Sequence, residues 1–183
     1  LLTDPRAADP EGEWHAPVRR WESGRIRKVA RRARGVRWRD AQEVPGITVD
    51  HDGAQVRAFV PGPVAEVPPP LAKLQVAGLD LAREEPKPAP EGPYAALALN
   101  PDVTMTTGKS AAQSGHAAHL LLRQGPPRDV AAWLAAGARV HLAGEVPWRE
   151  CVRRAGAVVR DGGFTEVPPG TMTAVAWFEG PRR

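Results

Sequence analysis

Several residue types and patterns are scarce or missing in this chain of 183 residues, and each absence excludes a class of protein. Cys151 is the single cysteine, so the chain forms no internal disulfide, which fits a reducing cytoplasm. No stretch approaches the roughly 18 consecutive apolar residues of a membrane-spanning helix, so we expect no membrane contact. Charged residues follow Leu1-Leu2 at once, so we expect no secretory signal peptide. Together these absences predict a cytoplasmic protein.

Lysine is scarce as well, because only four lysines stand among the 25 basic residues and the others are arginines. With 20 prolines and abundant alanine, this composition is typical of proteins from GC-rich bacterial genomes.

The arginines are concentrated in residues 18–39. This segment holds ten basic residues and one acidic residue, a net charge of +9, whereas the whole chain carries +4, which leaves −5 for the rest. Arginine-rich faces neutralise phosphates, so we expect the segment to hold the body of an RNA. The expected contacts come from Arg19, Arg20, Arg27, Lys28 and Arg31. The alternative is a solvated amphipathic helix that pairs with acidic patches of the remaining chain.

The first part of the chain, residues 1–83, predicts a small α+β region. Residues 1–12 are expected to be a poorly ordered lead-in, and the apolar spacing over 13–34 predicts one basic helix, in which Ser23-Gly24 allows a kink. Residues 46–60 alternate in the manner of a β-hairpin, with Asp52-Gly53 as its turn.

A proline-rich stretch, residues 84–93, predicts a stiff linker and a domain boundary. Residues 94–183 then alternate between strand and helix patterns, which predicts an α/β domain in which helices cover a sheet. Strands are expected at 94–99, 138–142, 157–160 and 171–178, and helices at 109–123, 128–136 and 147–155.

Lys109 has the most chemical promise of the polar residues in this domain. Gly108-Lys109-Ser110 is not a nucleotide-binding phosphate loop, because that motif needs glycine where Val103 stands. A lysine in the first turn of a helix still favours an anion, since the backbone amides and the helix dipole act in the same sense. The alternative is a lysine that faces solvent.

Histidines and one aspartate are further candidates. His116, His119 and His141 lack the spacing of a zinc site, so a metal enzyme is the weakest interpretation and structural histidines are expected. Asp161 follows a predicted strand and precedes two glycines, a place where ligands gather in α/β sheets, although turn capping explains it equally well. Thr165 and Thr173 are open to the same two interpretations.

Two segments of this domain carry a longer pattern. The first is Gly108-Lys109-x-Ala111-Ala112-Gln113-x-x-His116-Ala117. The second, about 50 residues later, is Asp161-x-Gly163-x-Thr165-x-Val167-x-Pro169-Gly170-x-x-Thr173. Together they resemble the type II peptidyl-tRNA hydrolases, the archaeal and eukaryotic kind, over residues 94–181. The chain departs from that family at Ser110 and Gly162, and Trp177 and Phe178 are expected to reshape the rim of the site.

The resemblance implies a three-layer α/β/α domain with a four-stranded mixed sheet and helices on both faces. It also implies hydrolysis, without a cofactor or metal, of the ester between a peptide and tRNA. The family's functional residues fall on Lys109, Asp161 and Thr173. The residues that line or support the site fall on Gly108, Gln113, His116 and Thr165. The substrate partner is peptidyl-tRNA, and the oligomeric state is open between monomer and homodimer.

Two other functions remain open from the sequence. One is a non-catalytic tRNA-binding or ribosome-binding protein that keeps the hydrolase fold. The other is an interaction protein whose N-terminal half recruits a partner, because a fold can be reused without its chemistry.

Overall fold

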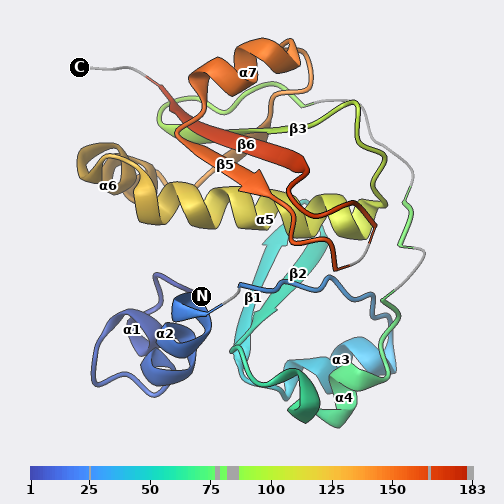
Figure 1. Ribbon diagram of the computed structural model, residues 1–183. Coiled ribbons are helices and arrows are strands. Elements are labelled where there is room, and N and C mark those ends of the chain that lie inside the picture. The colour runs from blue at the N-terminus through green and yellow to red at the C-terminus, as the bar shows by residue number, and fades with distance from the viewer. Residues whose placement is uncertain (25, 77–78, 82–86, 165, 181–183) are drawn as a thin grey trace. The chain divides into compact units, whose positions relative to one another are not determined.

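The computed structural model describes residues 1–24, 26–76, 79–81, 87–164 and 166–180 (Figure 1). The chain divides into two compact units, residues 1–76 and 77–183. The division falls before the predicted linker at 84–93, because the backbone amide of Gly108 donates to the carbonyl of Leu79 and so ties that residue to the second unit. Part of the predicted linker, residues 82–86, lies outside the described residues.

The second unit is built on a four-stranded mixed sheet, which confirms the predicted fold class. The strands run β4-β3-β6-β5 across the sheet, with β3 and β4 parallel and the other neighbours antiparallel. Their bounds are Tyr94–Leu99 for β3, Val140–Leu142 for β4, Ala157–Arg160 for β5 and Met172–Glu179 for β6. All four strands lie at positions that the sequence predicts.

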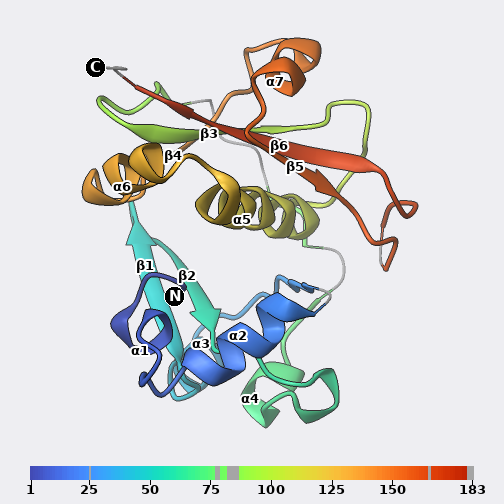
Figure 2. The same cartoon turned by 60° about the vertical axis from the view of Figure 1, so that its left-hand side comes forward.

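Helices cover both faces of this sheet, as predicted, and Figure 2 shows α7 on one face and α5 and α6 on the other. The helices are α5 (Thr107–Gln124), α6 (Pro127–Ala135) and α7 (Trp148–Arg154). On the α5 face, Ala95 and Leu97 of β3 pack with Leu121 and Trp133. On the α7 face, the alternate residues of β3 pack with Cys151. Many of these strand residues are alanines, whose small side chains leave room for helices to pack on both faces.

An irregularity in β6 decides which face Thr173 joins. Val159 of β5 pairs with Ala174, but the next residue, Arg160, pairs with Met172, so Thr173 is an extra residue in β6. Such a β-bulge interrupts the alternation of side chains, and bulges are common beside active sites. Here Met172 packs with the α7 core while Thr173 donates a hydrogen bond to Gln113 of α5. The bulge therefore turns the threonine toward α5.

The first unit combines short helices with the predicted hairpin. Its elements are α1 (Pro5–Ala8), α2 (His15–Ser23), α3 (Val36–Gln42), β1 (Gly46–His51), β2 (Ala54–Phe59), η1 (Val64–Glu66) and α4 (Pro69–Ala72). The antiparallel pairing of β1 and β2 confirms the hairpin, and Asp52 and Gly53 both have the positive φ of its turn. Arg57 of β2 donates to the carbonyls of Gln42 and Val44, which joins the hairpin to the end of α3.

Two predictions for the first unit are wrong. The single helix over 13–34 ends at Ser23, and residues 26–34 hold one β-bridge, between Arg32 and Gln75, in place of a helix. A continued helix would set like charges four residues apart, which destabilises it. Residues 1–12 are not a loose lead-in either, because they include α1, whose Ala7 is buried against Trp14.

None of the helices in the described part of the chain is both long and apolar enough to cross a membrane.

Candidate active site

The first turn of α5 is held by side chains from distant parts of the second unit. Thr106 is the N-cap residue, and its hydroxyl accepts a hydrogen bond from the amide of Lys109 at 3.2 Å. Glu166, in the loop between β5 and β6, accepts from both the amide (2.9 Å) and the hydroxyl (2.8 Å) of Thr106. This two-point contact fixes the start of α5 relative to the loop that carries Asp161.

Residues 79–81 cover the same end of the helix. The carbonyl of Leu79 accepts from the amide of Gly108 at 3.0 Å, and the carboxylate of Asp80 accepts from the amide of Thr107 at 3.2 Å. In return the hydroxyl of Thr107 accepts from the amide of Leu81 at 3.0 Å. The amides of the first turn are thus bonded within the protein. They are not open to an external anion, which differs from the expectation drawn from the sequence.

Gly108 allows this close approach. A Cβ atom at position 108 would lie 2.7 Å from Cδ1 of Leu79 and 2.8 Å from its Cβ, distances that real side chains do not tolerate. The glycine is therefore a contact point for Leu79, which is 7 % exposed.

Asp161 and Lys109 form a buried ion pair at the centre of the site. Nζ of Lys109 lies 2.5 Å from Oδ2 of Asp161, and their side chains are 11 % and 7 % exposed. Nε2 of Gln113, one turn after Lys109, donates to the same oxygen at 2.6 Å. The other carboxylate oxygen accepts from the amide of Gly163 at 2.7 Å. Each oxygen of Asp161 is therefore held by at least one donor.

Thr173 extends this network into the sheet. Its hydroxyl donates to Oε1 of Gln113 at 3.0 Å, which orients the amide so that Nε2 faces Asp161. Thr173 is completely buried and Gln113 is 6 % exposed. The sequence predicts Lys109, Gln113, Asp161 and Thr173 as site residues, and the structure brings all four together.

The loop that carries Asp161 folds back on itself. The amide of Asp161 donates to the carbonyl of Thr171, and the carbonyl of Asp161 accepts from the amide of Gly170 at 2.7 Å. Gly163 has a φ of +75°, and a Cβ there would lie 2.6 Å from Cδ of Pro169. The glycine and the proline of the sequence pattern are thus needed by one tight loop, which presents the carboxylate to α5.

Opposing effects act on the charge of Asp161. Burial would raise the pKa of this carboxyl, but the hydrogen bond from Lys109 lowers it, and the amide of Gly163, the Lys109 charge and Gln113 add to that lowering. The net pKa lies below its usual value, so Asp161 is ionised at neutral pH. The site therefore holds a fixed carboxylate beside an ammonium group.

The sequence also predicts His116 and Thr165 as site residues, and Trp177 and Phe178 as part of the rim. His116 is on α5, with its ring 6.4 Å from that of His119, and Thr165 is outside the described residues. Trp177 and Phe178 do not form the rim, because they stand four or more residues along β6 from Thr173. Trp177 packs with the α7 core, and the ring of Phe178 lies tilted against that of Trp133, with the ring centres 5.6 Å apart.

The predicted RNA contacts belong to the first unit and differ in their surroundings. Arg19 pairs with Glu22 at 3.1 Å, while Arg20 and Arg27 are exposed. Arg31 donates to the carbonyl of Leu71, next to the end of α4, which gives it a structural role.

Lys28 is half-buried, with its Nζ 4.8 Å from the centre of the Trp21 ring. Burial lowers the pKa of Lys28 to about 8, against a smaller opposing effect of Glu22. The ammonium group of Lys28 therefore packs against Trp21 within the first unit.

Within the described residues, no group of three or more histidine, cysteine, aspartate or glutamate side chains is arranged to hold a metal ion. Cys151 is buried, and its thiol donates to the carbonyl of Val146, which gives it a structural role. The functional contacts that the sequence did not indicate are those of Glu166 and of residues 79–81. Neither has a local signal, since both depend on long-range folding.

No protein-family model matches the chain, and no curated protein matches it. The function is therefore inferred from the contacts described above and from the resemblance in sequence.

We predict that Gly108→Ala detaches residues 79–81 from α5, because the added methyl group overlaps Leu79. Hydrogen exchange at the amide of Leu81 should accelerate by at least tenfold. Gly115→Ala is the matched control, since a Cβ at Gly115 meets nothing within 4 Å. That variant should leave the exchange unchanged and stabilise the helix by up to about 1 kcal/mol. Equal exchange rates in both variants would contradict the contact.

We also predict that Asp161 makes the protein less stable in acid. The folded pKa of Asp161 is below its unfolded value of about 3.9, so the unfolded chain takes up the proton first as pH falls. Its stabilising contribution is thus complete above that value and is lost as pH falls through the folded pKa. Urea unfolding between pH 7 and pH 2 should show a smaller acid loss for Asp161→Asn than for wild type. Asp102→Asn, at an exposed position, should behave as wild type.

Proposed function

We propose that this protein hydrolyses the ester bond between a peptide and the terminal ribose of tRNA, as the type II peptidyl-tRNA hydrolases do. The observation that carries the proposal is the buried network of Lys109, Asp161, Gln113 and Thr173, drawn from α5, the loop after β5, and β6. These are the residues of the sequence pattern that resembles that family. The proposed setting is the bacterial cytoplasm, with peptidyl-tRNA as substrate and without a cofactor.

Lys109 is the group best suited to stabilise the transition state. When water adds to the ester carbonyl, negative charge develops on the carbonyl oxygen, and a preorganised cation stabilises that charge strongly where water is excluded. An ammonium group carries three N–H donors, and its bond to Asp161 uses one of them. The ester bond to the ribose oxygen then breaks, which leaves a peptide carboxylate and a free hydroxyl on the tRNA.

Asp161 is better suited to orient than to abstract a proton. An efficient general base has a pKa near the working pH, whereas the pKa of Asp161 is lowered from an already acidic value. We therefore assign Asp161 the tasks of keeping Lys109 charged and in place, and of orienting the attacking water.

Thr173 takes a positioning role in this proposal. It is completely buried, and its hydroxyl is bonded to Gln113, which in turn donates to Asp161. Thr173 thus acts on the carboxylate through Gln113 without touching substrate.

The exposed arginines of the first unit are proposed to hold the body of the tRNA. Arg20 and Arg27 are the best candidates by exposure, because both are exposed, whereas Lys28 and Arg31 are partly buried. Long arginine side chains that reach solvent neutralise phosphates and release counterions.

A non-catalytic tRNA-binding protein is the second candidate function. The observation that favours it is the closed first turn of α5, where Leu79, Asp80 and Glu166 occupy groups that would otherwise face a ligand. A turnover assay separates the two functions, because both predict binding of tRNA and only one predicts release of peptide.

The proposed chemistry is tested by release of labelled peptide from a peptidyl-tRNA. We expect Lys109→Ala to lower the rate by roughly 100- to 1,000-fold, the usual effect of removing one oxyanion-stabilising donor. Lys73→Ala is the matched control, since it removes an exposed lysine of the other unit and should leave the rate unchanged. Full activity of Lys109→Ala would refute the assignment, and inactivity of the wild type would favour the non-catalytic alternative.

The proposed tRNA contact is tested by the salt dependence of binding. Replacing Arg20 and Arg27 together with glutamine should reduce the slope of log affinity against log salt by about 1.8, or about 0.9 for each lost phosphate contact. The control is Arg123→Gln with Arg128→Gln, which removes the same charge from exposed positions in the second unit. An unchanged slope in the first pair would indicate that these arginines serve only the solubility of the protein.

A further inference from the structure

Phe164 is an exposed aromatic side chain in the loop that also carries Asp161. Every phenylalanine, tyrosine and tryptophan of the chain lies within the described residues, and Phe164, at 53 % exposed, is the only one of them that is exposed. A single exposed apolar side chain is common on protein surfaces, so exposure alone indicates no function. The position of Phe164 relative to the candidate active site is therefore decisive.

Two contacts hold this loop on the first turn of α5. Asp161 forms the ion pair with Lys109, and Glu166 accepts from the amide and the hydroxyl of Thr106 at 2.9 and 2.8 Å. Phe164 stands between these two anchors in the chain, three residues after the first and two before the second. Phe164 is therefore held near the end of α5 that carries Lys109.

The ring of Phe164 lies against Gly162. A Cβ atom at position 162 would lie 2.8 Å from Cε2 of the ring and 3.1 Å from Cδ2, so one ring edge occupies the space of a side chain there. Consecutive Cα atoms are about 3.8 Å apart, which puts this ring edge within roughly 8 Å of the Cα of Asp161. Gly162 is also a position at which the chain departs from the type II family. Glycine at this position gives the ring its room beside the site.

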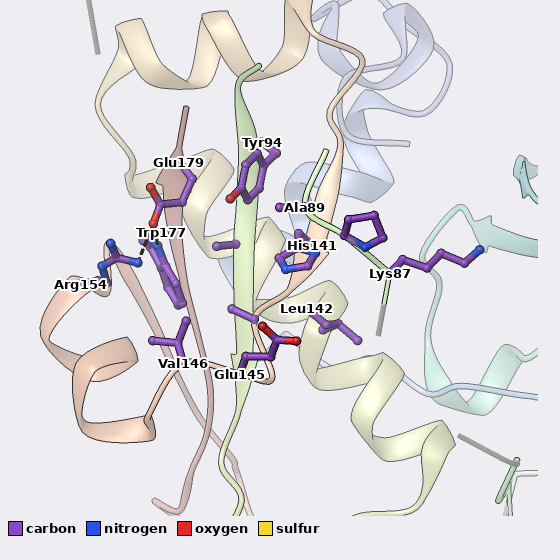
Figure 3. Close-up of a pocket in the computed structure, with 13 residues that line it drawn as sticks. Lys87, Ala89, Tyr94, His141, Leu142, Glu145, Val146, Arg154, Trp177 and Glu179 are labelled. Atoms are coloured by element: carbon purple, nitrogen blue, oxygen red, sulfur yellow. Dashed lines mark hydrogen bonds and ion pairs between the residues drawn. The ribbon is translucent and has the colours of Figure 1, made fainter. Parts of the chain in front are cut away.

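The aromatic wall on the other face of the sheet is packed instead. A cavity of about 480 Å³ lies there, lined by a row of His141, Ala96 and Trp177 across β4, β3 and β6. Ala96 and Trp177 are 1 % and 5 % exposed, and the indole N–H of Trp177 donates to Glu179 at 2.8 Å (Figure 3). The Trp177 ring is thus closed to a ligand, whereas more than half of the Phe164 surface is open.

The substrate of the proposed function carries an unpaired base next to the bond that breaks. The ester joins the peptide to the terminal ribose of tRNA, and the same ribose carries the base of the terminal adenosine. Proteins bind unpaired bases of RNA by stacking them on exposed aromatic rings. Because only the ribose separates the base from the ester, a base stacked on Phe164 would bring the ester close to Lys109 and Asp161.

We propose that Phe164 binds the terminal adenine of tRNA by stacking and so places the ester beside Lys109. This contact rests on the proposed function, from which the substrate is taken. It holds the end of the tRNA, whereas the arginines of the first unit hold its body. Stacking uses the π face that every base has, so the contact depends on the presence of a terminal base more than on its identity.

The kinetics of peptide release test this contact. Phe164→Ala should raise KM for peptidyl-tRNA by roughly tenfold, within the range for the loss of one base–aromatic stack. The kcat should stay unchanged, since the stack is present in the bound substrate and in the transition state alike. Phe164→Trp should keep the KM of the wild type. Leu142→Ala is the matched control, because Leu142 is 54 % exposed on the opposite edge strand of the sheet.

Two further comparisons address the ring and its occupant. Gly162→Ala should also raise KM, because the added methyl group displaces the Phe164 ring. The loss in Phe164→Ala should be equal for substrates that carry glycine or leucine as the esterified residue. A loss confined to the leucine substrate would assign the ring to the peptide and overturn the proposal, and so would an unchanged KM in Phe164→Ala.

Binding of a short RNA separates failure of this contact from failure of the proposed function. The probe is an RNA that ends in cytidine-cytidine-adenosine, and the comparison RNA lacks only the terminal base. The wild type should bind the complete RNA roughly tenfold more tightly, and Phe164→Leu, which keeps an apolar side chain without a π face, should bind both equally. If the wild type shows this difference but releases no peptide, the hydrolysis is refuted and the contact stands. Equal binding of both RNAs by the wild type would overturn the contact, and this measurement requires no variant to fold.

Discussion

The carboxylate of Asp161 joins three parts of the second unit that are far apart in the chain. Lys109 and Gln113 bring α5 to it, the amide of Gly163 brings its own loop, and Thr173 reaches it from β6 through Gln113. Because the carboxylate is buried, its charge is tolerated only while these donors remain in place. The position of α5 over the sheet, the closure of the loop and the orientation of Lys109 therefore depend on one ion pair and the hydrogen bonds around it.

The sheet separates two kinds of surface. On the α5 face, the bulge at Thr173 directs a hydroxyl into the charged network. On the α7 face, the regular alternation resumes, so Trp177 of the same strand packs with Cys151 of α7. The alanines of β3 serve both faces, since they pack with Leu121 of α5 on one and with Cys151 of α7 on the other. A single extra residue in β6 thus decides which of its side chains face α5 and which face α7.

Much of this arrangement can be predicted from the sequence. The alternation of apolar and polar residues and the positions of turn residues are local features of the sequence. The hairpin and all four strands of the sheet therefore lie where the sequence predicts. The two motif segments contain the residues of the network. The errors have physical causes. The predicted helix over 13–34 stops at Ser23, where apolar spacing is outweighed by crowded positive charge, and Ala7 is ordered by burial against Trp14, which no local pattern reveals. The contacts of Glu166 and Leu79 with the start of α5, and the row formed by His141, Ala96 and Trp177, appear only when the register of the sheet is known.

The occupied first turn of α5 has a consequence for competition among anions. Asp80 and Glu166 already accept hydrogen bonds from the amide donors at the start of α5, so they occupy the place that an external anion would take. An external anion that used these amides could bind only to molecules in which the carboxylates have left. Its apparent affinity would be its intrinsic affinity multiplied by that fraction of molecules. A small metabolite has too few other contacts to offset that loss, whereas a polyanion anchored at several points does. A polyanion would therefore compete for this end of the helix better than a small anion.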